Sequence, residues 1–142
     1  CFSVIDKNIL FSGDIVMGWT STLISPPDGD VGQYFNSLDK LLNRSDNVYL
    51  PGHGLQVEDA KTYVAKLKKH RMERENQILS ILKIRPLNSY QIANKIYKNQ
   101  PQPIIYAGSR NVFAHLINLL ERNLICCDGA ISPDNCFEFI NK

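Results

Sequence analysis

The chain has 142 residues, of which 44% are hydrophobic and 21% charged, with a formal net charge of +2. This length fits one domain or two small ones, and the composition is that of an ordinary globular chain. The nearly balanced charge does not by itself require a nucleic-acid partner. No apolar run approaches the roughly 20 residues that span a bilayer, so we predict no membrane partner.

The first half of the chain predicts mixed strands and helices. The expected order is strand 1–5, turn 6–8, strand 9–11 ending at 12–14, loop 26–30, helix 34–42, strand 48–50 and a helix from residue 58. Two interpretations of the last helix stay open, because it could continue to Ile84 or break near His70. The chain starts at Cys1 directly in strand-like sequence with no preceding turn, and we interpret it as truncated.

The second half predicts three helical segments followed by a β-hairpin. The expected order is the end of the long helix, a short helix from residue 88 or 89, loop 100–103, helix 110–123, strand 124–127 and strand 136–140. Helix, helix, helix and hairpin is the element order of a winged helix, a variant of the helix-turn-helix motif. We therefore expect an α+β winged-helix-like domain over residues 71–142.

The four cysteines are Cys1, Cys126, Cys127 and Cys136, and no pair has C-x-x-C spacing. The adjacent pair lies in strand-like sequence, so its side chains should point to opposite faces. This arrangement makes joint binding of one zinc ion awkward. We favour free thiols in a reducing compartment.

Two residues at strand ends are candidate metal ligands. Asp14 follows the apolar strand that ends in Ser-Gly, and His53 follows the next predicted strand within Pro-Gly-His-Gly. Carboxylate and neutral imidazole are suitable ligands for a divalent ion. By composition alone, however, a turn or cap aspartate and a tight Pro-Gly-His-Gly loop are the favoured explanations of the two segments.

The combination of these segments resembles the second half of the metallo-β-lactamase superfamily. Residues 8–14 match its strand running into F-S-G-D, and residues 49–54 match its strand running into P-G-H-G. Residues 19–22 and 34–41 fit the order and spacing between the two motifs. Within the superfamily the chain is similar to the β-lactamase-like branch that carries a C-terminal winged helix and includes an animal mitochondrial endoribonuclease. The residues similar to that enzyme are His70-Arg71, Arg74-Glu75, Gln77-Ile78-Leu79 and Ile96-Tyr97-Lys98-Asn99.

The resemblance implies an α/β fold, namely the C-terminal half of an αββα sandwich over residues 1–70, followed by the winged-helix-like domain. It implies two divalent metal ions, with zinc expected. Asp14 would bridge the two ions, and His53 would be a terminal ligand of the second one. It also implies a hydrolase in which metal-bound hydroxide attacks an ester, thioester, lactone or phosphodiester, and RNA is one candidate substrate. We expect a cytoplasmic protein, or a mitochondrial matrix protein in a eukaryote.

The family's H-x-H-x-D-H motif does not occur in the chain. Because Asp14 and His53 cannot form a dinuclear site alone, we expect the fragment to be inactive without the upstream half of the same domain. The expected partners are that upstream half and a small-molecule or RNA substrate. Whether the protein forms a homo-oligomer is left open by the sequence. The sequence therefore assigns the hydrolase activity to the parent protein.

His70 and Arg71 are candidate contacts to an anionic substrate, although a solvated interdomain helix explains the same charged segment. The alternative function is a non-catalytic winged-helix module that binds nucleic acid or protein. The predicted recognition helix at residues 110–123 carries few cations, which is a weak nucleic-acid signature.

Overall fold

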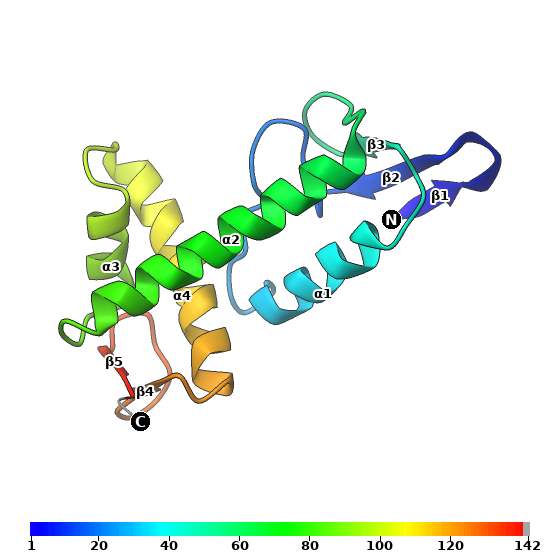
Figure 1. Ribbon diagram of the computed structural model, residues 1–142. Coiled ribbons are helices and arrows are strands. Elements are labelled where there is room, and N and C mark those ends of the chain that lie inside the picture. Colours follow the sequence, from blue (N-terminus) through cyan, green and yellow to red (C-terminus); the bar gives the residue numbers. More distant parts are fainter. Residues whose placement is uncertain (141–142) are drawn as a thin grey trace. The chain divides into compact units, whose positions relative to one another are not determined.

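The computed structural model describes residues 1–140, whose elements are labelled in Figure 1. The helices and strands are β1 (Phe2–Val4), a 3-10 turn (Ile5–Lys7), β2 (Ile9–Gly13), α1 (Val31–Leu42), β3 (Val48–Pro51), α2 (Ala60–Leu82), α3 (Ser89–Ile96), α4 (Gln102–Glu121), β4 (Ile125–Cys127) and β5 (Phe137–Phe139). Among these residues no helix is long and apolar enough to cross a membrane.

The described residues divide into two compact units. The first comprises residues 1–22 and 32–72, and the second comprises residues 23–31 together with the chain from residue 73. The segment 23–31, which lies in the first half of the sequence, therefore groups with the second unit. A division into domains 1–70 and 71–142 stays a prediction.

The structure corrects one predicted helix boundary and decides between two alternatives for another helix. Helix α4 begins at Gln102 rather than at residue 110, so the predicted loop 100–103 is wrong in its second half. The first helical N–H groups have no intrahelical partner, so Pro103 loses nothing at the second position of the helix. Helix α2 continues without a break from Ala60 to Leu82, which settles the alternatives left open at His70.

The first unit contains a three-stranded sheet in the order β1-β2-β3. Strands β1 and β2 are antiparallel, whereas β2 and β3 are parallel. One face of the sheet is closed, because Leu10, Ser12 and Tyr49 are all at most 2% exposed. The Tyr49 hydroxyl donates to the Leu41 carbonyl at 3.2 Å, so this face packs on α1.

The opposite face of the same sheet is apolar and open. Phe2 pairs with Phe11, which pairs with Leu50, and Val4 pairs with Ile9 in the next row. Directly paired residues point to the same side of a sheet, so these side chains form one apolar surface. Phe2 is 81% exposed and Phe11 is 47% exposed. A sheet normally buries its apolar face against another element, and residues 1–140 do not supply one.

The second unit has its own core. The end of α2, the helices α3 and α4 and the hairpin β4-β5 contribute to a single cluster of buried side chains. A capping box begins α3, in which the Asn88 side chain accepts from the Gln91 backbone and the Gln91 side chain accepts from the Asn88 backbone. Leu87 and Phe137 exchange two backbone hydrogen bonds of 3.2 and 3.0 Å, which join the segment before α3 to the hairpin. The element order is the predicted one of helix, helix, helix and hairpin.

Candidate metal centre

Asp14 and His53 meet because they follow two neighbouring parallel strands. Asp14 comes directly after β2, and His53 follows β3 after a single glycine. Gly13 pairs with Pro51 at the end of the ladder, after an irregularity in register that follows Phe11. The carboxyl ends of parallel strands lie at the same edge of a sheet, where polar side chains of successive loops converge. Side chains 39 positions apart thus come into contact.

The two side chains lie within hydrogen-bond distance. The His53 Nδ1 and Asp14 Oδ1 atoms are 2.7 Å apart, and the side chains are 63% and 59% exposed. An exposed pair of this kind contributes little to stability, about 0–1 kcal/mol. Because both side chains are exposed, a metal ion can reach the imidazole and the carboxylate together, and both groups are common metal ligands.

The glycines beside these residues permit the close approach of the two loops. A Cβ atom on Gly52 would lie 2.8 Å from the Asp14 Oδ1 atom. Gly54 has φ +90°, and a Cβ atom there would meet the Gly18 backbone at 2.9 Å. Glycine therefore fills the Pro-Gly-His-Gly positions for steric reasons. The Gly18 N–H donates to the His53 carbonyl at 3.0 Å and fixes this contact.

The loop that starts at Asp14 is held by four side-chain hydroxyl groups. Four successive carbonyl groups accept hydrogen bonds from these hydroxyl groups: Asp14 from Thr22, Ile15 from Tyr34 at 3.1 Å, Val16 from Ser12 at 3.0 Å and Met17 from Tyr63 at 2.8 Å. The donors come from a strand, two helices and the loop itself. Because backbone groups in irregular segments need partners, this hydroxyl clamp determines the path of the loop that carries Asp14.

Arg71 supports the same clamp from α2. It is only 3% exposed, its guanidinium group donates to the Thr22 carbonyl, and it lies 5.4 Å from the centroid of the Tyr34 ring. Burial raises the pKa of Tyr34 above its ordinary value, against an opposing effect of Arg71. The Tyr34 hydroxyl therefore stays protonated at neutral pH and can donate to Ile15.

Of the four site residues predicted from the sequence, two lie in contact, one is buried and one is exposed. It brings Asp14 and His53 together, and it places Arg71 in the interior of the first unit. His70 is exposed on α2, and its contact with a substrate stays a prediction. Within residues 1–140 no group of three or more His, Cys, Asp or Glu side chains could hold a metal ion. The described site is thus a pair of donors.

The clamp residues are not among the site residues predicted from the sequence. Tyr34 and Tyr63 lie in the two helices predicted for the first half of the chain, and a buried tyrosine hydroxyl usually requires a hydrogen-bond partner. Two tyrosines on the inward faces of two helices were therefore the available signal. The sequence did not indicate which carbonyl groups they would reach.

The chain is similar in sequence to known beta-lactamase-like proteins. No protein-family model matches the chain. It is 29% identical over 127 residues to a beta-lactamase-like protein 2 homolog of Caenorhabditis elegans, covering 89% of the chain and 40% of that protein. It is 31% identical over 117 residues to the Drosophila melanogaster homolog, covering 80% of the chain and 39% of the relative. An atrochrysone carboxyl ACP thioesterase of Aspergillus chevalieri is 30% identical over 83 residues, 58% of the chain and 26% of that protein.

Solved structures share the fold. A metallo-beta-lactamase family protein from Thermus thermophilus superposes with a TM-score of 0.81 and 20% identity, covering 98% of the chain and 44% of that structure. A beta-lactamase domain protein from Burkholderia ambifaria superposes with a TM-score of 0.84 and 20% identity, covering 97% and 43%. The chain spans about 40% of the length of the first two sequence relatives.

Proposed function

The chain belongs to the metallo-β-lactamase superfamily, as a C-terminal part of such a protein, and from this premise we propose that Asp14 and His53 are ligands of a divalent metal centre in a hydrolase. The family relatives are lactamase-like proteins and a thioesterase, which supports a hydrolase at the level of the family. The remaining ligands would come from the upstream half of the same domain.

The two donors fit this metal centre. A carboxylate can bridge two ions, and a neutral imidazole can complete the coordination of one of them. Both side chains are more than half exposed at the edge of the sheet, so a metal ion and further ligands can reach them. When bound, two divalent ions supply Lewis acidity and lower the pKa of a coordinated water. We expect zinc.

The observation that carries the proposal is the 2.7 Å contact between His53 and Asp14 on a loop fixed by four hydroxyl groups. Metal ligands must be held close to their productive geometry by surrounding hydrogen bonds. The clamp does this for Asp14, and the Gly18 N–H does it for the backbone of His53. These residues orient the donors before any metal ion binds.

The open apolar face around Phe2 and Phe11 is the expected docking surface for the upstream half. Two sheets that pack face to face bury their apolar sides about 10 Å apart, which would complete an αββα sandwich. Removing the exposed area of these side chains from water would stabilise the assembly by roughly 25 cal/mol per Å². Residues 1–142 alone would then be inactive, because the remaining ligands and the other sheet of the sandwich are supplied from upstream.

Two finer features belong to the same proposal. We assign a winged-helix-like fold to the second unit, because its elements follow the order helix, helix, helix and hairpin. We also assign the protein to the cytoplasm or, in a eukaryote, to the mitochondrial matrix. The scissile bond would be an ester, thioester, lactone or phosphodiester. The thioesterase relative favours a thioester, and the sequence similarity to the endoribonuclease branch favours RNA.

The decisive experiment replaces each proposed ligand in the complete protein that carries this chain. We expect His53→Ala and Asp14→Asn to lower bound zinc, measured by elemental mass spectrometry, and to abolish hydrolysis of a thioester and of an RNA substrate. Circular dichroism should stay unchanged, because the pair contributes little to stability. Asp6→Asn, at another exposed aspartate, is the matched control and should retain both zinc and activity.

The alternative is a non-catalytic binding module. In that case the ligand variants would retain any function of the protein, and no metal would be lost. Full zinc content and full activity in both His53→Ala and Asp14→Asn would refute the metal-centre proposal.

A further inference from the structure

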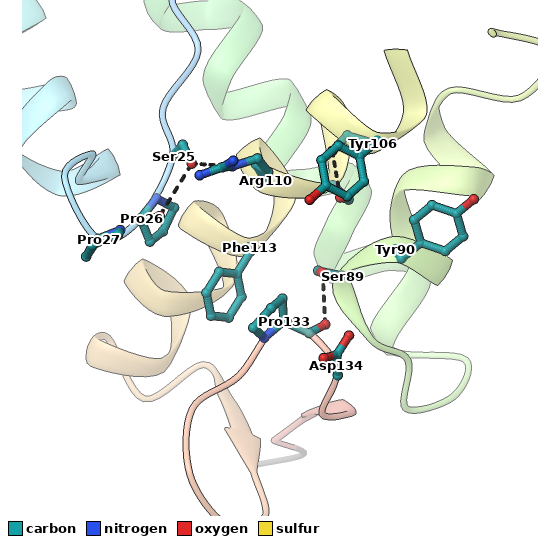
Figure 2. A pocket seen from close by; sticks show the side chains of 11 residues that line it. Ser25, Pro26, Pro27, Ser89, Tyr90, Tyr106, Arg110, Phe113, Pro133 and Asp134 are labelled. Atoms are coloured by element: carbon teal, nitrogen blue, oxygen red, sulfur yellow. Dashed lines mark hydrogen bonds between the residues drawn. The ribbon is translucent and has the colours of Figure 1, made fainter. Parts of the chain in front are cut away.

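The second unit carries an open cavity that the metal-centre proposal does not use. Its volume of about 750 Å³ lies within the range of roughly 300–1,000 Å³ that is typical of small-molecule sites. Segment 23–31, α3, α4 and the loop between β4 and β5 contribute its walls, and all of them belong to the second unit. Figure 2 shows the lining side chains.

The walls of the cavity are fixed by hydrogen bonds. The Ser89 hydroxyl donates to the Pro133 carbonyl at 2.9 Å, which holds the hairpin loop against the start of α3. The Ile24 N–H donates to the Asn111 side chain at 2.9 Å, which holds segment 23–31 on α4. The Tyr90 hydroxyl donates to the Gln102 side chain at 2.8 Å. A cavity held in this way can bind a ligand with little ordering cost.

The lining combines flat apolar surfaces with one cation. Tyr106 is 63% exposed and Tyr90 is 41% exposed, so a ligand can reach part of both rings. Phe113 and three prolines, Pro26, Pro27 and Pro133, complete the apolar walls. Arg110 donates from Nε to the Ser25 hydroxyl at 2.6 Å. This bond orients the guanidinium group and leaves its two terminal nitrogens able to bind an anion in the bidentate manner that suits phosphate.

Asp134 provides an acceptor away from the cation. It lines the same cavity, and Figure 2 shows Arg110 and Asp134 at different ends with Phe113 between them. The ligand must therefore carry an anion at one end, a planar body and a hydrogen-bond donor at the other end. A nucleotide whose base has an amino group has these three parts in this order.

We infer that this cavity binds a nucleoside monophosphate, either free or as one unit of a single strand, with its phosphate at Arg110 and its base against Tyr106 and Phe113. Stacking on aromatic side chains and a positive charge at the backbone are how proteins hold unpaired nucleotides. The Asp134 carboxylate accepts hydrogen bonds from the amino edge of the base. The bases with an amino group, namely guanine, adenine and cytosine, are therefore preferred over uracil, which has none.

The test is calorimetric titration of the complete protein that carries this chain with GMP, UMP and inorganic phosphate. EDTA is present throughout, so that the result does not depend on the metal centre. We expect GMP to bind more tightly than UMP and than phosphate alone. Arg110→Met should weaken GMP binding about tenfold or more, and Tyr106→Leu should weaken it roughly tenfold. Asp134→Asn should remove the preference for GMP over UMP.

Two control variants separate binding from folding. Arg85→Met removes an equal charge from an exposed position that does not line the cavity, and it should leave GMP binding unchanged. Ser25→Ala removes the bond to Arg110 but keeps the guanidinium group, so binding should change less than about threefold. An equal loss in Ser25→Ala and Arg110→Met would mean that the arginine only holds segment 23–31, and this would overturn the inference.

The source of the nucleotide follows from a competition experiment. If a single-stranded oligoribonucleotide displaces GMP, the cavity takes a unit of a strand, and if it does not, the cavity takes the free nucleotide. Absence of GMP binding at millimolar concentration would refute the proposal, as would binding that Arg110→Met and Tyr106→Leu leave intact. Neither result would affect the metal-centre proposal.

Discussion

Replacing Gly52 by alanine would place a methyl group against the Asp14 carboxylate. The new Cβ atom would lie 2.8 Å from Asp14 Oδ1, whereas ordinary contacts begin at 3.4 Å. The carboxylate must therefore move by about 0.6 Å, which exceeds the tolerance of roughly 0.5 Å within which functional groups must be held. We expect zinc affinity to fall about 10- to 100-fold, the size of effect seen when the surroundings of a ligand are disturbed.

The same change should leave the fold intact. Gly52 does not have a positive φ, so alanine fits its backbone conformation. A substitution of this kind changes the free energy of unfolding by less than about 1 kcal/mol, often in the stabilising direction. Zinc affinity is measured by competition with a chelating dye in the complete protein that carries this chain, and stability is measured by urea denaturation.

Gly13→Ala provides the contrasting variant. Gly13 has φ +57°, and a Cβ atom there would meet nothing within 4 Å. Alanine should therefore cost about 1–2 kcal/mol of stability through backbone strain, with a much smaller loss of zinc affinity. The steric reasoning would be refuted if Gly52→Ala kept zinc affinity within twofold of the unmodified protein.

Three further predictions concern the clamp, the pH dependence and the second unit. Tyr34→Phe removes the shorter of the two hydroxyl contacts to the Ile15 carbonyl and should lower the free energy of unfolding by about 0.5–1.5 kcal/mol in urea denaturation; no change would show that the clamp is unimportant. Arg44 holds the pKa of Asp46 below its ordinary value. The ionised carboxylate therefore stabilises the fold fully at a pH above the ordinary aspartate pKa, and this stabilisation is lost as the pH falls through the lowered pKa. Asp46→Asn should thus reduce stability at pH 7 and flatten the acid limb of the stability profile, and an identical loss at all pH values would contradict this assignment. Asn88→Ala removes the capping box and should cost about 1 kcal/mol, detected as a lower thermal midpoint; an unchanged midpoint would mean that water replaces the cap.

The sequence by itself determined most of the secondary structure and both candidate ligands. The apolar run that ends in Ser-Gly-Asp and the Pro-Gly-His-Gly segment placed Asp14 and His53 at strand ends, as the structure has them. These are local patterns, in which the strand period and turn residues act over a few positions. Helix α4 begins earlier than predicted because the first turn of a helix accepts proline, and Pro103 lies in that turn.

Tertiary structure decided what these elements do together. The parallel pairing of β2 with β3 brings Asp14 to His53, and Tyr34 and Tyr63 reach carbonyl groups 19 and 46 positions away. The cavity likewise requires segment 23–31 to lie on α4. Such contacts depend on register and packing between segments far apart in the chain, and a periodic pattern carries no information about its distant partner.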